Sequence, residues 1–479
     1  RFHAVGCDPS RDPVVRERTG NPETFHSVWL SRDGHWLVAS VSTFSGDDVY
    51  YRDLRCPESP WLTLVEGIEA NFFVQAWADR FVVVTNLDAP RGRVLRVDPA
   101  CPGACPGDWE EIVAEDPEAV LRGATLAGGH LVLTYVRNAV GTIEVRSLDG
   151  AVVHTIALPS IGRVSGVVGA ADQDEAYVEF SSFLHPPEVY RFSVETGEAS
   201  VWSKVPRPVD PSPFTLEQVR YPSKDGTLIP MFLVHRTDIA RDGATPFLLT
   251  GYGGFGVSME PVFDPTLYPW LEAGGAVAVA SVRGGGEYGE EWHRAGARCH
   301  KQNSFDDFIA GAEYLVAEGY TAPRRLAIQG GSNGGLLVGA ALTQRPELFA
   351  AVVCADPLLD MLRYHRFGAG RTWISEYGSP EDADAFEWLY AYSPYHRVRA
   401  GTSYPPVLFV SSDSDDRVDP LHARKMAAAL QDAGGGRTPV LLRIEANAGH
   451  GGADKVSSAV ETWTDVYAFL FATLGVSGG

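Results

Sequence analysis

Cysteine is scarce in this sequence, and long apolar segments are missing. Six cysteines in 479 residues are too few for a disulfide framework, which favours a reducing compartment. No apolar run approaches the roughly 20 residues that a membrane-spanning helix needs. These shortages argue against a disulfide-stapled scaffold and against a protein that crosses a membrane.

Residue patterns that bind metal are also missing. The motif H-E-x-x-H does not occur. Cys101 and Cys105 lie among prolines and glycines, but no second pair of cysteines or histidines follows nearby. We therefore expect no metal and no cofactor, and at this loop a local disulfide rather than a zinc site.

Basic residues are outnumbered. Lysine and arginine total 40 against 61 aspartates and glutamates, so the formal net charge is −21. This balance argues against nucleic acid and against anionic membrane surfaces as partners. The acidic residues are dispersed along the chain, which indicates a solvated surface rather than a binding site.

The chain opens at Arg1 without a methionine or a signal peptide. We expect that it was processed or is a fragment, so a targeting segment could lie outside it. We expect a cytoplasmic monomer, and leave the periplasm and secretion open as alternatives.

The first part of the chain has the pattern of a β-propeller. Short apolar runs, the first near Val28 and later ones at 81–84, 131–133 and 176–178, recur about every 45 to 50 residues. That period is typical of a propeller blade, so we expect residues 1–205 to form an incomplete propeller of about four blades. A β-sandwich with chance spacing is the alternative.

A proline-rich segment at 205–213 marks a change of pattern. Beyond it, expected strands alternate with expected helices, which predicts a mostly parallel, doubly wound sheet with helices on both faces over residues 206–479. The expected strands are 246–250, 276–281, 326–329, 351–354, 407–411 and 440–444. The expected helices are 304–318, 336–344, 420–431 and 455–474.

The most informative motif is the G-x-S-x-G run at 330–334, centred on Ser332. A short apolar strand precedes it and a Leu- and Ala-rich helix follows, which is the context of a nucleophile elbow in an α/β-hydrolase domain. Such a turn exposes the serine hydroxyl at a helix N-terminus, where the dipole favours negative charge. The alternative is a glycine-rich turn with an incidental serine.

A serine nucleophile needs a base, and the base needs an orienting carboxylate. In an α/β-hydrolase the three follow in the order serine, acid, histidine, on loops after strands. His450 lies among glycines after the last expected strand. Spacing alone leaves the acid open among the aspartates after the preceding strand, which are Asp413, Asp415, Asp416 and Asp419.

Seven blocks of this sequence, in order, resemble the prolyl oligopeptidase family of serine peptidases. They are residues 249–255, 283–289, 301–308, 330–338, 373–378, 415–418 and 448–451. The weaker β-rich part also fits the propeller of that family. Family members begin with a helical segment and carry seven blades, so the resemblance implies a chain that lacks its N-terminal part.

The resemblance assigns roles to individual residues. It implies Ser332 as nucleophile, Asp415 as acid and His450 as base. It places the Asn333 N–H and the Tyr252 hydroxyl in the oxyanion hole. The substrate-binding residues that it implies are Trp373, Arg417, Phe255, Tyr377 and Val418. An ion pair with the neighbouring aspartates is the alternative for Arg417, and a plain core position is the alternative for the aromatic residues.

The resemblance implies a serine endopeptidase that acts on proline-containing oligopeptides and cuts after proline. Oligopeptidase B, which prefers basic residues, has the same fold and is one alternative, although Asn333 and Trp373 favour the prolyl type. A carboxylesterase or an acyl-aminoacyl peptidase is more distant. From a different class, the chain could be an inactive, truncated remnant that only binds peptide.

Overall fold

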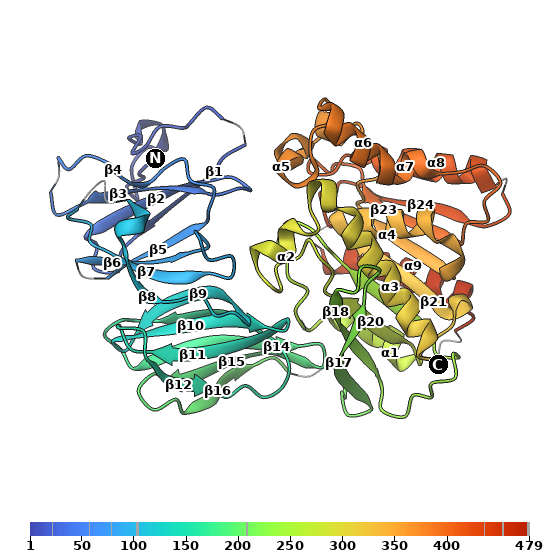
Figure 1. Cartoon of the computed structure of the whole chain (residues 1–479), viewed down its shortest axis with the longest axis horizontal. Coiled ribbons are helices and arrows are strands. Elements are labelled where there is room, and N and C mark those ends of the chain that lie inside the picture. The colour runs from blue at the N-terminus through green and yellow to red at the C-terminus, as the bar shows by residue number, and fades with distance from the viewer. Residues whose placement is uncertain are drawn as a thin grey trace.

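A computed structural model describes residues 1–21, 23–56, 58–77, 79–101, 105–206, 209–434, 436–452 and 455–476. The chain folds into two lobes that lie side by side (Figure 1). The N-terminal lobe is built of strands, and the C-terminal lobe is a sheet covered by helices. Arg207 and Pro208, in the proline-rich segment between the lobes, lie outside the described residues.

The N-terminal lobe contains four antiparallel sheets of four strands each, formed by strands consecutive in sequence. The first is β1 Phe25–Leu30, β2 Trp36–Ser42, β3 Asp47–Asp53 and β4 Leu62–Val65; the second is β5 Phe72–Trp77, β6 Arg80–Thr85, β7 Arg93–Val97 and β8 Glu110–Val113. The third is β9 Ala119–Ala127, β10 His130–Arg137, β11 Val140–Arg146 and β12 Val152–Ile156; the fourth is β13 Arg163–Gly169, β14 Glu175–Ser182, β15 His185–Ser193 and β16 Ala199–Lys204. The predicted β-propeller fold is confirmed, and the β-sandwich alternative is wrong.

Apolar side chains from neighbouring blades pack against each other. Tyr51 of β3 and Phe81 of β6 meet edge to face with their ring centroids 5.2 Å apart, in a core that both blades share. Separate cores join the second blade to the third and the third to the fourth. Strand alternation places one row of side chains in each of these cores, so each blade is stabilised by its neighbours.

The C-terminal lobe is organised around one eight-stranded sheet with the order β17-β18-β20-β19-β21-β22-β23-β24. Its strands are β17 Phe214–Pro222, β18 Leu228–Arg236, β19 Phe247–Gly251, β20 Ala276–Ala280, β21 Leu326–Gly331, β22 Ala351–Ala355, β23 Val407–Ser412 and β24 Val440–Glu445. All pairs from β20 to β24 are parallel, and β17 and β18 form an antiparallel hairpin at one edge. The predicted α/β-hydrolase fold is confirmed.

Helices cover both faces of this sheet (Figure 1). The longer helices are α3 Gln302–Ala317, α4 Asn333–Gln344, α6 Ala383–Tyr392, α8 Leu421–Gly434 and α9 Val456–Leu474. The short helices are α1 Tyr268–Glu272, α2 Glu290–Arg294, α5 Ile374–Tyr377 and α7 Pro394–Arg397. Along β19, Leu249 packs on the face of α3 and α4 and Leu248 on the face of α1 and α9, so both faces of the strand are apolar.

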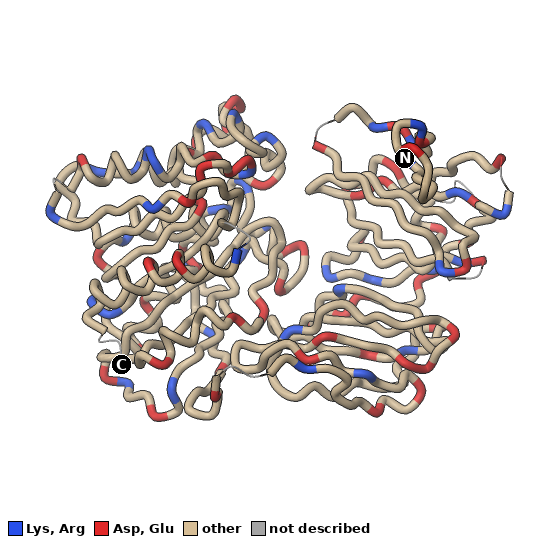
Figure 2. Tube along the Cα trace, turned by 180° about the vertical axis from the view of Figure 1, so that it is seen from behind, with Lys and Arg blue, Asp and Glu red and all other residues tan. Residues whose placement is uncertain are grey.

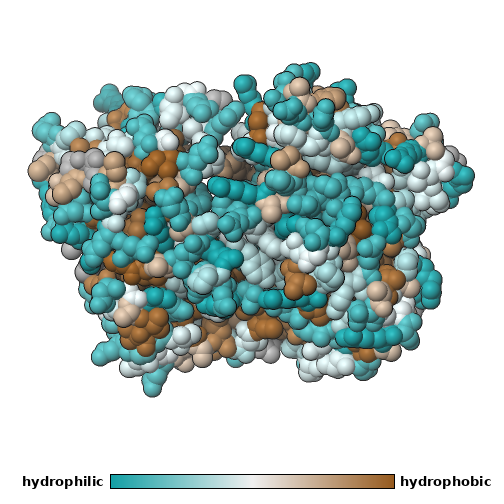
Figure 3. Space-filling model, in the orientation of Figure 1, coloured by the Kyte–Doolittle hydropathy of each residue, from teal (hydrophilic) through white to brown (hydrophobic). Residues whose placement is uncertain are grey.

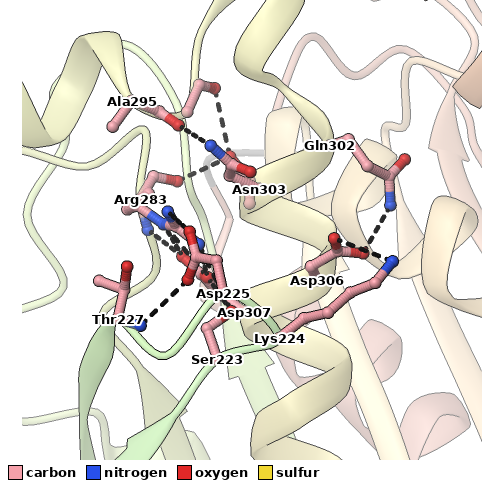
Figure 4. Close-up of polar contacts among 12 residues, drawn as sticks. Ser223, Lys224, Asp225, Thr227, Arg283, Ala295, Gln302, Asn303, Asp306 and Asp307 are labelled. Atoms are coloured by element: carbon pink, nitrogen blue, oxygen red, sulfur yellow. Dashed lines mark hydrogen bonds and ion pairs between the residues drawn. The ribbon is translucent and has the colours of Figure 1, made fainter.

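A buried ion pair joins α3 to the loop after β20 (Figure 4). The Arg283 guanidinium donates to both carboxylate oxygens of Asp307, which is fully buried, and to Asp225 in the β17–β18 turn. The Ser223 hydroxyl also donates to Asp307. Two of the sequence blocks that resemble the family therefore serve the frame of the lobe.

All six cysteines are free, so the expected local disulfide between Cys101 and Cys105 does not form. Acidic and basic residues are interspersed over both lobes (Figure 2). Hydrophilic residues cover most of the face seen in Figure 3, with separate apolar patches on each lobe. Within the described ranges, every helix is too short or too polar to cross a bilayer.

Candidate active site

Ser332 occupies the turn between β21 and α4. Its backbone has φ +56°, a left-handed conformation that is costly for a residue with a side chain, and its N–H donates to the Ala355 carbonyl at 2.9 Å. A Cβ on Gly330 would lie 2.1 Å from the Gly334 carbonyl oxygen, so that position accepts glycine alone. The local sequence thus builds the sharp turn that presents the serine at the carboxyl edge of the sheet.

The predicted acid and the predicted base lie after β23 and β24, along the same edge of the sheet. Asp415 lies in the loop after β23, and His450 lies in the loop after β24. The Asp415 Oδ2 and the His450 Nδ1 are 2.7 Å apart, at hydrogen-bond distance. Backbone N–H groups of Arg417 and Val418 donate to the other oxygen of Asp415 at 2.9 Å, so both oxygens are occupied.

The pKa of Asp415 reflects these contacts. Burial pushes it upward, but the hydrogen bond with His450 and the backbone N–H groups outweigh burial and hold the pKa below its usual value. The carboxyl is therefore ionised at neutral pH. The other three aspartates that spacing left open make different contacts: Asp413 accepts from the Asn447 N–H, Asp419 accepts from the Leu421 N–H, and Asp416 is exposed.

Two donors lie beside the serine. Asn333 is the first residue of α4, so the helix does not use its N–H, and its side-chain amide donates to the Tyr252 carbonyl at 2.6 Å. Burial raises the pKa of Tyr252. A hydrogen bond with Ser332 and the charge of Arg417 oppose that rise without cancelling it. The Tyr252 phenol therefore keeps its proton at neutral pH and can donate a hydrogen bond next to the serine hydroxyl.

The three predicted substrate-binding aromatics form one cluster. The Phe255 ring lies edge-on to Trp373 at 6.5 Å and to Tyr377 at 5.6 Å between centroids. Trp373 is 7% exposed and Tyr377 is fully buried. The Tyr377 hydroxyl donates to the Asn333 side chain at 2.7 Å, which ties this cluster to the elbow. Both the core position and a pocket wall fit this arrangement.

Val418 is buried directly behind Asp415, whereas Arg417 is exposed. Among the described residues, the Arg417 guanidinium makes no ion pair with the neighbouring aspartates, so the alternative raised for it is not seen. Its charge acts instead on the Tyr252 phenol. A cation that is free and close to the serine is available to a substrate carbonyl.

The propeller reaches this site. Phe44, in the β2–β3 loop, lies 5.6 Å from Phe255 between ring centroids. A cavity of about 340 Å³ lies between the two lobes there. Residues of both lobes line it, including Arg91, Arg122 and His293. The aromatic cluster is therefore bordered by a space large enough for part of a peptide.

Sequence reasoning missed a buried charge network beside the loop that carries Tyr252 and Phe255. The Lys301 ammonium donates to the Gly253 carbonyl at 2.6 Å and pairs with Glu376 at 3.3 Å, and Glu376 also pairs with His293 at 2.7 Å. Burial lowers the pKa of Lys301, and Glu376 opposes that shift. This network holds the loop that carries Tyr252 and Phe255.

Sequence reasoning also missed Asp356, which follows β22 directly. An aspartate placed after a buried strand adjacent to the serine strand was the signal that could have found it. Asp356, Asp415 and His450 each offer one ligand atom within 4.8 Å of the other two, the one group of the described chain that could hold a metal ion. The His450 ring already interacts with Asp415 at hydrogen-bond distance.

Comparisons with known proteins agree across the chain. The family model described as "Prolyl oligopeptidase family" matches residues 261–477, and the model described as "Prolyl oligopeptidase, N-terminal beta-propeller domain" matches residues 1–205. Prolyl endopeptidases from Elizabethkingia meningoseptica and Elizabethkingia miricola are 36% and 37% identical over 99% of this chain. The chain spans 67% of the length of each of these relatives.

Solved structures match equally well. A structure from a study of two prolyl endopeptidases is 54% identical, with a TM-score of 0.94, and the match covers 99% of this chain and 70% of that one. Prolyl oligopeptidase B from Galerina marginata, bound to a 35mer hydrolysis and macrocyclization substrate, is 32% identical, with a TM-score of 0.93 over 100% of this chain and 68% of that one. The apo form of that relative gives a TM-score of 0.76.

Proposed function

The chain belongs to the prolyl oligopeptidase family, and from that premise we propose that it hydrolyses short peptides on the C-terminal side of proline. The proposed nucleophile is Ser332, with His450 as the base and Asp415 as the acid. The observation that carries the proposal is the 2.7 Å contact between Asp415 and His450, at the sheet edge where the elbow presents Ser332.

In the proposed reaction, the Ser332 oxygen attacks the carbonyl carbon of the substrate proline while His450 accepts the serine proton. The tetrahedral oxyanion is stabilised by the Asn333 N–H and the Tyr252 hydroxyl. Collapse of this intermediate breaks the C–N bond, and His450 gives its proton to the leaving amine. A water molecule, deprotonated by His450, then attacks the acyl-serine ester, and His450 returns the proton to the Ser332 oxygen as the ester bond breaks.

Specificity is proposed to come from Trp373, Phe255 and Tyr377, with Val418 beside them. A proline ring is rigid and apolar, so it gains from stacking on an aromatic wall. Arg417 is proposed to bind a substrate backbone carbonyl, because its guanidinium is exposed near the serine. Together these residues would favour proline before the scissile bond.

Two measurements test the proposal. A fluorophosphonate should label Ser332 stoichiometrically, and a chromogenic peptide with proline before the scissile bond should be cleaved faster than its arginine, alanine or simple ester analogues. Ser332→Ala and His450→Ala should abolish turnover, and Asp415→Asn should reduce kcat by about 10⁴, as in other serine triads. Asp419→Asn is the matched control.

Each alternative predicts a different outcome. A clear preference for arginine would move the chain to the oligopeptidase B type, and a preference for simple esters would favour a carboxylesterase. Peptide binding without labelling would indicate an inactive remnant. We also propose a cytoplasmic monomer, which the six free cysteines support for the compartment. Light scattering on the purified chain would reveal a dimer if the monomer proposal is wrong.

A further inference from the structure

Asp356 is a second carboxylate at the edge of the sheet that carries the proposed triad. It follows β22, which lies between β21, the strand of Ser332, and β23, the strand of Asp415. Its backbone has φ +38°, and its N–H donates to the Val410 carbonyl at 2.8 Å. Its backbone is thus held in a sparsely populated conformation, and the residue is only 7% exposed.

Asp356 contacts the loop that carries His450, called the histidine loop below. The Gly451 N–H, in the residue after His450, donates to the Asp356 Oδ2 at 2.9 Å. The other oxygen, Oδ1, is buried and has no hydrogen-bond partner among the described residues. Because Asp356 is within 4.8 Å of ligand atoms of both Asp415 and His450, its charge acts on the imidazole at short range.

The titratable groups that face Asp356 are His450, Asp415 and Cys354. Burial raises the pKa of Asp356, the Gly451 N–H and His450 oppose that shift, and Asp415 adds to it. The pKa of Asp415 is lowered instead. The two carboxylates beside the imidazole therefore ionise over different pH ranges.

We propose that Asp356 is a positioning residue for His450: it holds the histidine loop through Gly451, and its carboxylate favours the protonated imidazole that forms when Ser332 attacks. This inference rests on the proposed function, because it takes His450 as the base. It adds a second carboxylate to a site that needs one acid. Its effect is expected on acylation and on the pH at which His450 becomes active, rather than on substrate binding.

Two substitutions at Asp356 separate its hydrogen bond with the Gly451 N–H from its negative charge. In Asp356→Asn the amide oxygen can still accept the Gly451 N–H, so the loop stays anchored while the charge is lost. Asp356→Val removes both. Asp413→Asn is the matched control, since Asp413 accepts from Asn447 of the same loop but is exposed. Thermal unfolding would verify that each variant is folded.

The first readout is the acylation rate of the full chain in single turnover with a proline ester or amide. We expect Asp356→Asn to slow acylation by roughly tenfold or more, the order seen when residues that orient metal-binding imidazoles are removed. The acidic limb of kcat/KM should move to lower pH, because the imidazolium loses a neighbouring negative charge. KM should change little, and Asp356→Val should be slower still.

The second readout does not need activity. In protein labelled with ¹³C at the histidine ring, the His450 signal, assigned with His450→Gln, should titrate at lower pH in Asp356→Asn than in the wild type and in Asp413→Asn. An unshifted His450 titration together with wild-type acylation in Asp356→Asn would overturn the inference. Failure of the proposed function would be seen separately, as a wild-type chain that a fluorophosphonate does not label.

Discussion

At the scale of single residues, the site depends on side chains whose protons are held in place by burial and hydrogen bonds. Tyr252 keeps its phenolic proton because burial raises its pKa, and Asp415 is ionised because His450 and two backbone N–H groups stabilise its charge. A neutral donor and a fixed carboxylate are what an acyl-transfer site requires.

Removing the Tyr252 hydroxyl tests the donor. We expect Tyr252→Phe to lower kcat by about 10²–10³ with KM nearly unchanged, because the hydroxyl would contact the oxyanion only in the transition state. Stopped-flow acylation would measure the effect. Tyr404→Phe is the control, since that buried phenol accepts the Arg399 N–H in the loop that leads into β23, at the opposite edge of the sheet. An unchanged acylation rate would leave the backbone donors alone in the oxyanion hole.

Trp373 tests the specificity of the pocket. Trp373→Ala should lower kcat/KM for proline substrates by about 1–3 kcal/mol more than for alanine substrates, because a buried stacking surface is lost. Trp373→Phe keeps an aromatic wall and should retain most of the preference. Equal losses for both substrates would place Trp373 in the core rather than in the pocket.

At the scale of elements, the loop after β20 holds a buried titratable group. Glu287, in the loop after β20, is 1% exposed and accepts the Met259 N–H at 2.7 Å. Burial raises its pKa to about 7. The folded chain therefore retains a proton on Glu287 that the unfolded chain releases near its usual pKa.

The difference in the pKa of Glu287 between the folded and unfolded states sets how the free energy of unfolding changes with pH. As pH rises from about 4.5 to 7, the folded state binds more protons than the unfolded state, so the free energy of unfolding falls, on the order of 3 kcal/mol for this group. Glu287→Gln should remove that decline and be more stable than the wild type at pH 8. Urea unfolding at pH 5 and pH 8 measures it. The exposed Glu291→Gln is the control, and parallel pH curves for Glu287→Gln and wild type would contradict the prediction.

At the scale of the whole molecule, a few contacts join the lobes near the site. Phe44 meets Phe255, the Arg91 guanidinium donates to the Tyr288 carbonyl, and the Glu290 N–H donates to the Pro90 carbonyl. The whole chain matches a substrate-bound relative at a TM-score of 0.93 and the apo form of that relative at 0.76. The lobes are also joined by Phe183 against Phe232 and by the Gln218 side chain, which donates to the Asn138 carbonyl. We therefore expect only the contacts near Phe44 to break when the lobes separate.

We expect the chain to open without peptide, because access to a site between two lobes requires it. Small-angle X-ray scattering should give a smaller radius of gyration after reaction with a peptide-like proline inhibitor. Phe44→Ala should raise KM for long peptides by about two- to tenfold, which corresponds to the free energy of one aromatic pair. The KM for short substrates should change little. Trp202→Ala, an exposed aromatic on the outer strand β16, is the control. An identical radius in both states would contradict the opening.

Local sequence was enough to predict the elbow, the order of the site loops and the two fold classes. The sharp turn at Ser332 requires glycine beside it, because a Cβ on Gly330 would collide with the Gly334 carbonyl. Strand and helix periods are also local, so the observed elements of the sheet differ from the expected ones mostly by a residue or two at their ends. The missed helices α1 and α5 have only five and four residues, too few for a repeated apolar face. The ten-residue helix α6 was missed as well, although it buries Ala385, Leu389 and Tyr392 on one face.

Only the tertiary structure decided which carboxylates face His450. Four aspartates lie within seven residues after β23, and the direction of each side chain depends on the turn that Arg417 and Val418 make around Asp415. Asp356 is 94 residues before His450 in sequence, and they meet because parallel strands end at one edge of the sheet. Contacts of this kind depend on strand order, which no local pattern encodes.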